Sequence, residues 1–259
     1  MRVLVKIAGS RDVRKLYFTC SATVAGPAHL TKNIPNQDAF ALVRRRKFTV
    51  LVVSDGLGSK PLSHIGSQYA CQVVVSQVQD LSQDKKAFYK LFSGGCDQIA
   101  ARQFLQGIVH AWKQAILPHH AKECSATCLL AVVARQGIFT ARLGDGMICL
   151  LGRNAQVLLS DKDDTGFSNV TRCLSDQDAC QKFQYDFFAR KDFSRILLTT
   201  DGISADLEEG QELPFASDLF QELERQPQSQ RNKYIAAMMK NWPVPHHTDD
   251  KTLVLARLQ

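Results

Sequence analysis

The sequence predicts an α+β fold, because strands and helices come in separate runs along the chain. Strand-like segments come first, two helical patterns follow, and a series of short strands leads to two more helical patterns and a closing strand. Alternating β and α segments would instead predict a parallel sheet. The composition is that of an average globular protein, with 45% hydrophobic and 22% charged residues among 259. No repeat or Pro/Gly-rich linker divides the chain, so one domain over residues 1–259 is expected.

The first strands are expected at residues 16–24, 39–43 and 48–54. The third contains the uninterrupted apolar run VLVV at 50–53, which is typical of a strand buried on both faces. No apolar run approaches the ~20 residues that a membrane helix needs. The N-terminal apolar patch is short and Lys6 interrupts it, so we expect no secretory signal.

Two helical patterns follow these strands. Residues 65–78 are rich in Ala, Gln and Val and come after Ser63, a candidate N-cap. Between residues 99 and 115, apolar side chains recur every three to four positions, which predicts an amphipathic helix that ends before Pro118. Further strands are expected at 126–134, 138–143, 147–151, 157–159, 183–189, 195–200 and 252–258, and further helices at 215–225 and 231–242.

The eight cysteines contain no Cys-x-x-Cys pair, and most lie inside apolar segments. Free cysteine behaves as a small buried hydrophobe. With no secretory signal, reduced thiols and a cytoplasmic location are expected rather than disulfides. A zinc site at Cys124 and Cys128 is the alternative to a role in the core.

Basic residues exceed acidic ones by 32 to 25, a net charge of +7, which could favour anionic partners. The densest basic run is RRRK at residues 44–47, between two expected strands. A solvated hairpin tip is the simpler interpretation, and a docking patch is the alternative. The hypothesis that the protein binds nucleic acid would rest on the net charge alone.

Five aspartates lie at the ends of apolar strands. Asp55 ends VLVVSDG, Asp201 ends ILLTTDG and Asp145 ends TARLGDG, while Asp38 and Asp249 precede strands. Asp-Gly is also a hairpin signal, and this reading suits Asp145, which has strands on both sides. It suits Asp55 and Asp201 less well, because no alternating strand follows either. Rigid strands commonly present metal ligands at their open ends.

Carboxylates brought within a few ångström of one another repel, and a divalent cation removes that cost. Ligand sets made only of oxygen suit Mg²⁺ or Mn²⁺ rather than zinc. Two such ions ~4 Å apart activate water for in-line displacement at phosphorus. From these residues alone, metal-assisted phosphate chemistry and a scatter of surface aspartates both remain open.

A series of short motifs runs in a fixed order from about residue 20 to 258. The segments are Asn36-Gln37-Asp38-Ala39, Val53-Ser54-Asp55-Gly56-Leu57-Gly58, Gly66-Ser67-Gln68-Tyr69-Ala70, Ser125-Ala126-Thr127 with Gly144-Asp145-Gly146, Thr200-Asp201-Gly202, and Asp249-Asp250-Lys251-Thr252. Their order and spacing resemble the metal-dependent serine/threonine protein phosphatases of type 2C, also called PPM. The Gln-Asp variant and the short chain are most similar to the bacterial branch. Each motif is weak alone, and the ordered set is specific.

The resemblance implies a fold of two antiparallel β-sheets sandwiched between helix layers. It implies hydrolysis of phosphoserine and phosphothreonine on proteins by a metal-bridging water, without a phosphoenzyme. The cofactors would be two Mg²⁺ or Mn²⁺ ions, with a third held more loosely. The partners would be phosphorylated proteins and an opposing serine/threonine kinase, and neither nucleic acid nor a membrane is expected.

The resemblance also assigns roles to single residues. Asp55 would bridge the two metals, and the Gly56 carbonyl would complete one site. The second site would be held by Asp201 and Asp249, and these two residues with Asp55 would carry catalysis. The remaining assignments are Asp38, which would contact metal-bound water or orient a ligand, and Asp145, which would share the looser metal with Asp201.

Several positions depart from the family pattern. The usual Glu before the first Asp is Gln37, which supplies one less negative charge and predicts weaker metal binding. The family's phosphate-binding Arg falls on Asn33, so Lys32, or alternatively His29, would bind the substrate phosphate. These departures leave open a second function, a catalytically weak module that binds phosphoproteins. The retained aspartates argue against it, because a pure binder needs no carboxylate cluster.

Histidines offer few further candidates. The position at which some family members carry a general-acid His is Leu57. His64 lies close by, but a helix-capping or surface role is the simpler expectation. His246 and His247 precede Asp249; they could line the mouth of the site, but loop residues without a role there are the simpler expectation.

Overall fold

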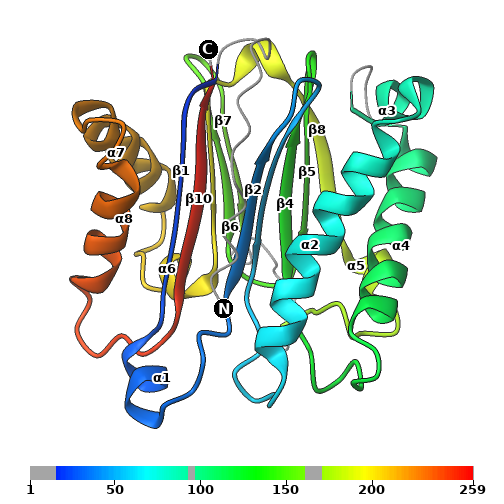
Figure 1. Ribbon diagram of the computed structural model, residues 1–259. Helices are drawn as coiled ribbons and strands as arrows, with labels where there is room; N and C mark the ends of the chain where they lie inside the picture. Colours follow the sequence, from blue (N-terminus) through cyan, green and yellow to red (C-terminus); the bar gives the residue numbers. More distant parts are fainter. Residues whose placement is uncertain (1–15, 93–96, 161–170, 259) are drawn as a thin grey trace.

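Two antiparallel sheets packed face to face, with helices on both outer faces, make up the computed structural model (Figure 1). It describes residues 16–92, 97–160 and 171–258. The first sheet has the order β1-β10-β9-β6-β7 and the second the order β2-β3-β4-β5-β8. This is the α+β sandwich expected from the sequence and from the family resemblance.

The first and last strands of the chain pair with each other. The first sheet consists of β1 (Leu16–Val24), β10 (Lys251–Leu258), β9 (Arg195–Thr199), β6 (Met147–Leu151) and β7 (Gln156–Ser160). The second sheet consists of β2 (Ala39–Arg44), β3 (Thr49–Ser54), β4 (Cys128–Val133), β5 (Gly137–Leu143) and β8 (Gln184–Ala189). Because β10 pairs with both β1 and β9, the two ends of the chain close the first sheet together.

Strand β3 is buried on both faces, as its apolar run predicts. Leu51 and Val53 belong to the core between the sheets, together with Leu198 of β9 and Val254 of β10. Val50 and Val52 alternate with them and pack into the core beneath the helices. The two-residue period of a strand therefore divides one apolar run between two cores.

The helices lie in two outer layers (Figure 1). Those over the second sheet are α2 (Ser63–Leu81), α3 (Lys85–Phe92) and α4 (Gln98–Ala115). Those over the first sheet are α7 (Glu212–Arg225) and α8 (Arg231–Lys240). The short elements are α1 (Pro27–Lys32), α5 (Ala179–Lys182), α6 (Asp201–Ser204) and the 3₁₀ turn η2 (Arg190–Asp192).

Gly66 brings helix α2 close to the loop before β4. A Cβ atom at this position would lie 1.7 Å from the Cys124 carbonyl oxygen, so only glycine fits. The Gly66 carbonyl accepts a hydrogen bond from Trp112 Nε1 at 2.9 Å, which joins α2 to α4. This contact fixes the loop that leads to Ser125 and Thr127, beside the end of β3.

The expected elements agree with the structure except at their ends. Strands 16–24 and 147–151 match β1 and β6 residue for residue, and the helix at 99–115 starts one residue earlier. The expected cap at Ser63 is wrong: Leu62 is the N-cap, while Ser63 lies inside the helix and its hydroxyl donates to the Lys60 carbonyl. Helices α1 and α3 were not expected, because each is too short to show a clear period.

The described cysteines form no disulfide with one another, as expected. Cys124 and Cys128 are both buried in the core beneath the helices, in agreement with the role in the core, and burial raises the pKa of Cys128 to about 12. Among the described residues, no helix combines the length and the apolar character needed to cross a bilayer.

Candidate metal centre

The five aspartates singled out in the sequence flank strands of both sheets. Asp55 follows β3, Asp201 follows β9 and opens α6, and Asp145 lies in the turn between β5 and β6. The other two, Asp38 and Asp249, come just before β2 and β10. The antiparallel strand directions bring all these points to one end of the sandwich, the lower end in Figure 1.

Asp55, Asp145 and Asp201 form the closest group. Each offers a carboxylate oxygen, and these oxygens all lie within 4.8 Å of one another. Burial raises the pKa of Asp55 well above its ordinary value, and the charges of Asp38, Asp145 and Asp249 raise it further. Burial, followed by the charges of Asp55, Asp145 and Asp249, raises the pKa of Asp201 to about 9. The group is therefore suited to binding cations.

Asp38 lies deeper than the group and connects the two sheets. Its Oδ2 accepts a hydrogen bond from Thr200 Oγ1 at 2.8 Å, and Thr200 Oγ1 in turn accepts one from the Thr252 N–H. Burial raises the pKa of Asp38 to about 8. No donor among the described residues reaches its buried Oδ1. This unsatisfied oxygen beside an all-oxygen cluster fits a Mg²⁺ or Mn²⁺ centre.

The end of β3 is held in place by Thr127. The Asp55 N–H donates to Thr127 Oγ1 at 2.9 Å, and the Thr127 N–H donates to the Asp55 carbonyl at 2.8 Å. Gly56 follows directly, and a Cβ atom there would lie 2.7 Å from the Ser63 carbonyl oxygen. Glycine is therefore required where the Asp55-Gly56 peptide approaches the end of the sandwich that carries the five aspartates, called the metal end below.

The Asp145 turn is both a hairpin and a part of the cluster. Gly144 and Gly146 have φ values of +97°, which glycine adopts without strain. Asp145 Oδ2 accepts a hydrogen bond from Thr171 Oγ1 at 2.7 Å. The two readings that the sequence offered for this position are thus compatible.

Asp250, to which the sequence assigned no role, accepts three hydrogen bonds beside the cluster. It is buried, and its carboxylate accepts hydrogen bonds from the Gly26 N–H at 2.7 Å, the Gln37 N–H at 2.6 Å and His29 Nδ1 at 2.9 Å. The neighbouring Asp249 is exposed. Asp250 therefore joins the β1–β2 connection to the start of β10, and its N–H donates to Asp249 Oδ1 at 2.9 Å.

Asn33, at the position where the family that the sequence resembles carries a phosphate-binding Arg, ends helix α1. Asn33 is the C-cap of α1 and has a left-handed backbone with φ of 52°. Asn tolerates this conformation better than most residues. Lys32 is exposed in the last turn of α1, whereas the His29 side chain is mostly buried against Asp250. Of the two candidate cations, only His29 is held in place.

Gln37 is buried beside the cluster. Its backbone carbonyl accepts hydrogen bonds from the Gly56 N–H and from Ser67 Oγ. Its Nε2 donates to the Lys60 carbonyl at 3.4 Å, and its Oε1 meets no donor among the described residues. An amide oxygen left in this state is free to accept a hydrogen bond from water.

The remaining histidines add little to the cluster. His64 lies within the first turn of α2 and is half-buried, while the N-cap of this helix is Leu62. Burial lowers the pKa of His64, which keeps its ring neutral. His246 is an exposed loop residue with φ of 61°, and His247 follows it in the loop before β10.

The family model described as Protein phosphatase 2C matches residues 25–240. No curated protein matches the chain in sequence. A bacterial serine phosphatase superposes with a TM-score of 0.63 at 13% identity, over 93% of this chain and 97% of that one. Stp1, a serine/threonine phosphatase from Staphylococcus aureus, gives 0.63 at 13% identity, over 97% and 99% of the chains.

A third similar structure is the catalytic domain of the serine/threonine protein phosphatase PstP, solved in complex with two manganese ions. It has a TM-score of 0.59 and 13% identity, and the match covers 93% of this chain and 97% of that one. At such identities these likenesses establish the shared fold.

The raised pKa values predict how pH acts on the metal-free protein. Asp201 titrates near 9 in the fold and near 3.8 when unfolded, so between these values the folded chain binds more protons and loses stability as pH rises. Asp201→Asn removes this dependence. In EDTA, its melting temperature relative to wild type should rise by several degrees from pH 5 to 8, since 1 kcal/mol is about 2–4 °C at this size. Asp218→Asn on α7 is the control. If the difference in melting temperature between Asp201→Asn and wild type did not change from pH 5 to 8, raised pKa values in the cluster would be contradicted.

The buried position of Gln37 predicts the effect of restoring a carboxylate. Gln37→Glu places a negative charge near the cluster, where a unit charge ~4–6 Å from a cation is worth a few kcal/mol before desolvation. Mn²⁺ affinity measured by calorimetry should rise about 10-fold, which requires ~1.4 kcal/mol. Gln72→Glu, on the exposed face of α2, adds the same charge and should have little effect. Unchanged affinity in Gln37→Glu would place this side chain outside the metal centre.

Proposed function

The chain belongs to the protein phosphatase 2C family, and we propose that it hydrolyses phosphoserine and phosphothreonine on proteins with Mg²⁺ or Mn²⁺ as cofactor. The observation that carries this proposal is the half-buried group of Asp55, Asp145 and Asp201 at one end of the sandwich. We further propose that residues 1–259 form one phosphatase domain and that a serine/threonine kinase opposes it.

The carboxylates divide among the proposed cations as follows. Asp55 would bind both ions, the Gly56 carbonyl would complete one site, and Asp201 and Asp249 would hold the other. Asp145, with Asp201, holds a third and looser ion. When bound, these cations supply a water nucleophile at neutral pH and stabilise the charge that develops on the phosphoryl group.

The chain's own groups position the reactants. Thr127 holds the backbone on both sides of the Asp55 carboxylate, so the carboxylate cannot move away from its neighbours. Thr200 fixes Asp38 through Oδ2, which leaves Oδ1 to accept a hydrogen bond from water in the site. Fixed oxygens of this kind lower the cost of ordering water and substrate during the reaction.

His29 is the better candidate for the substrate phosphate. Its Nδ1 is engaged by Asp250, so the ring is oriented and Nε2 remains for a ligand. The charge of His29 already acts on Asp249, which places the ring close to the metal end. Lys32, one turn further along α1, is exposed and has no partner among the described residues. We therefore assign the phosphate contact to His29, with Lys32 as the alternative.

Removing a cluster carboxylate tests the phosphatase proposal directly. Asp55→Asn and Asp201→Asn should each lower hydrolysis of p-nitrophenyl phosphate in Mn²⁺ by at least about 100-fold, because each removes a ligand of the reacting centre. The melting temperature in EDTA should not fall, since repulsion is relieved. Asp218→Asn, on the exposed face of α7, is the matched control.

Turnover near that of wild type in either variant would reject the metal centre. A wild-type protein that binds a phosphoprotein yet shows no turnover with any divalent cation would identify the weak binding module instead.

A second pair of variants separates the two candidate cations. His29→Asn keeps a donor near the position of Nδ1 for Asp250 but removes Nε2, so it should raise KM for a phosphopeptide several-fold more than it lowers kcat. Lys32→Ala should change KM by less than about 2-fold, as an exposed charge contributes little. The reverse order of effects would transfer the role to Lys32.

A further inference from the structure

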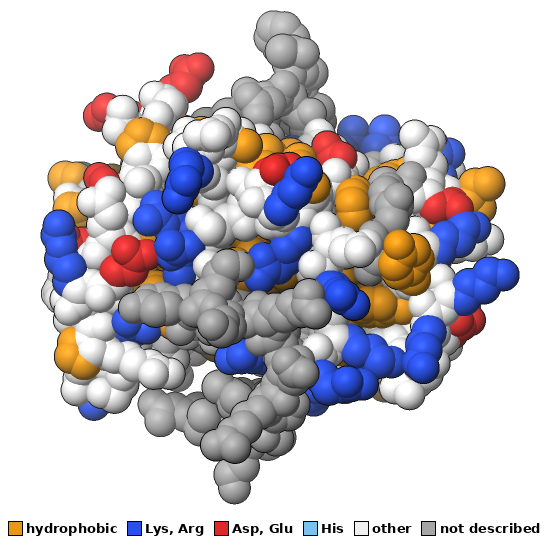
Figure 2. Space-filling model, turned by 90° about the horizontal axis from the view of Figure 1, so that it is seen from above, with side chains coloured by type: hydrophobic (Ala, Val, Ile, Leu, Met, Phe, Trp, Pro, Cys, Tyr) orange, Lys and Arg blue, Asp and Glu red, His pale blue; other side chains and the backbone are white. Residues whose placement is uncertain are grey.

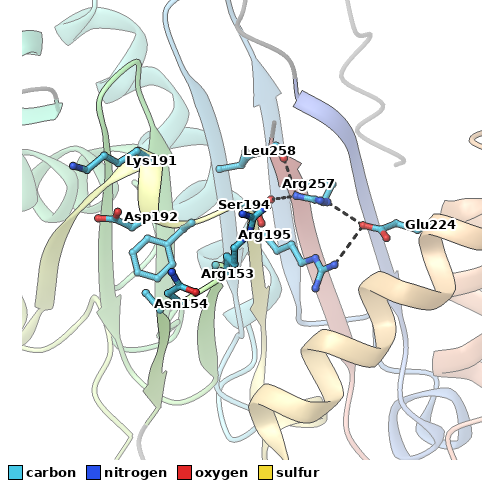
Figure 3. Close-up of a pocket in the computed structure, with 12 residues that line it drawn as sticks. Arg153, Asn154, Lys191, Asp192, Ser194, Arg195, Glu224, Arg257 and Leu258 are labelled. Carbon is cyan, nitrogen blue, oxygen red and sulfur yellow. Dashed lines mark hydrogen bonds and ion pairs between the residues drawn. The ribbon is translucent and has the colours of Figure 1, made fainter.

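A cavity of about 1110 Å³ lies at the opposite end of the sandwich from the aspartates. Figure 3 shows it among the turn between β6 and β7, the 3₁₀ turn η2, the adjoining ends of β9 and β10, and the end of α7. The β6–β7 turn can lie against η2 because residue 152 is glycine. A Cβ atom there would be 1.8 Å from the Asp192 carbonyl oxygen.

Cations outnumber anions among the charged residues that line the cavity. Its charged residues are Arg153, Lys191, Arg195 and Arg257 on the positive side and Asp192 and Glu224 on the negative side. Arg153 and Lys191 are exposed, and neither forms an ion pair with another described residue. The excess of positive charge is therefore available to a ligand.

Two of the guanidinium groups are held in a fixed arrangement by one carboxylate. Glu224 Oε1 lies 2.9 Å from Arg257 Nε and 3.7 Å from Arg195 Nη2 (Figure 3). Arg257 Nη1 also donates to the carbonyls of Ser194 and Leu258. Within the described chain, the buried Arg195 Nε has no hydrogen-bond partner. A pair of cations ordered in advance binds carboxylates and phosphates at low entropic cost.

The basic run singled out in the sequence belongs to the same end of the molecule. Residues 44–47 form the tip of the hairpin between β2 and β3, and all four are exposed. Lys and Arg side chains gather over this face when the molecule is viewed from above (Figure 2). The cavity and the hairpin tip thus place positive charge on one face, away from the acidic metal end.

We propose that this face is a docking site for an acidic segment of a partner protein. The cavity is concave, which suits the side chains of a peptide better than a flat bilayer. Asp192 and Glu224 lie among the cations, so the uniformly charged backbone of a nucleic acid would meet repulsion there. A peptide can place carboxylates opposite the arginines and other side chains opposite Asp192 and Glu224.

The docking site goes beyond the proposed phosphatase reaction and does not depend on it. The metal end stays open when the opposite end is occupied. A partner held there would be kept at high local concentration around the phosphatase without blocking access to the aspartates.

Binding of a labelled acidic peptide tests the proposal. The probe is a fluorescein-labelled peptide of Glu and Gly without Ser or Thr, and anisotropy is measured in EDTA at low and at physiological ionic strength. The variant Arg153→Glu/Lys191→Glu reverses two exposed charges of the cavity. The control Arg102→Glu/Lys240→Glu reverses two exposed charges on helices α4 and α8. Circular dichroism and melting temperature establish that each variant is folded.

The cavity variant should weaken peptide binding about 10-fold or more, and the control should weaken it by less than about 2-fold. Equal weakening in both variants would mean that net charge alone attracts the peptide, and would overturn the proposal, as would the absence of saturable binding.

Vesicles containing phosphatidylserine, or duplex DNA, should compete poorly with the peptide. If vesicles or DNA bound more tightly than the peptide, and the cavity variant lost that binding, the partner would be a membrane or a nucleic acid and the proposal of a protein partner would be wrong. Hydrolysis of p-nitrophenyl phosphate should be unchanged in both variants, so failure of the docking site and failure of the phosphatase proposal remain distinguishable.

Discussion

Repulsion among buried carboxylates is the constraint on which the rest of this structure depends. Asp55, Asp145 and Asp201 hold carboxylate oxygens within 4.8 Å of one another in a poorly hydrated space. A flexible chain would relieve the repulsion by moving these side chains apart. Here the aspartates adjoin the ends of packed strands, and Thr127 fixes the backbone at Asp55. Because the backbone holds the carboxylates close together, their repulsion persists until a cation binds, and relief of that repulsion favours binding.

The second requirement is that the two sheets stay in register at the metal end. Asp38 comes from one sheet and receives its hydrogen bond from Thr200 of the other. Asp250 accepts three donors from the β1–β2 connection, including His29. Each of these carboxylates accepts a hydrogen bond from groups distant in the chain, so loss of either would loosen the site as well as remove a charge. Folding and site assembly are therefore one event.

The charge distribution follows from the same arrangement. Antiparallel strands have two ends, and the aspartates occupy only one of them, while the hairpin tip at 44–47 and the cavity near Arg257 lie at the other. Separation by the length of the strands keeps each charge from neutralising the other, since screening acts over about 8–10 Å in physiological salt. The molecule thus presents an end suited to cations and phosphate and an end suited to an acidic partner.

The sequence by itself determined the strands and the candidate ligands. The continuous apolar run of β3 and the three-to-four spacing in α4 depend on neighbouring residues, and an aspartate at the end of an apolar strand can be recognised locally. Only the tertiary structure decided that Asp250 binds His29 across 221 positions, that Asn33 is a left-handed cap, and that Arg195 and Arg257 share Glu224. These contacts join segments far apart in the chain, and no local pattern records which distant side chains will meet when two sheets pack together.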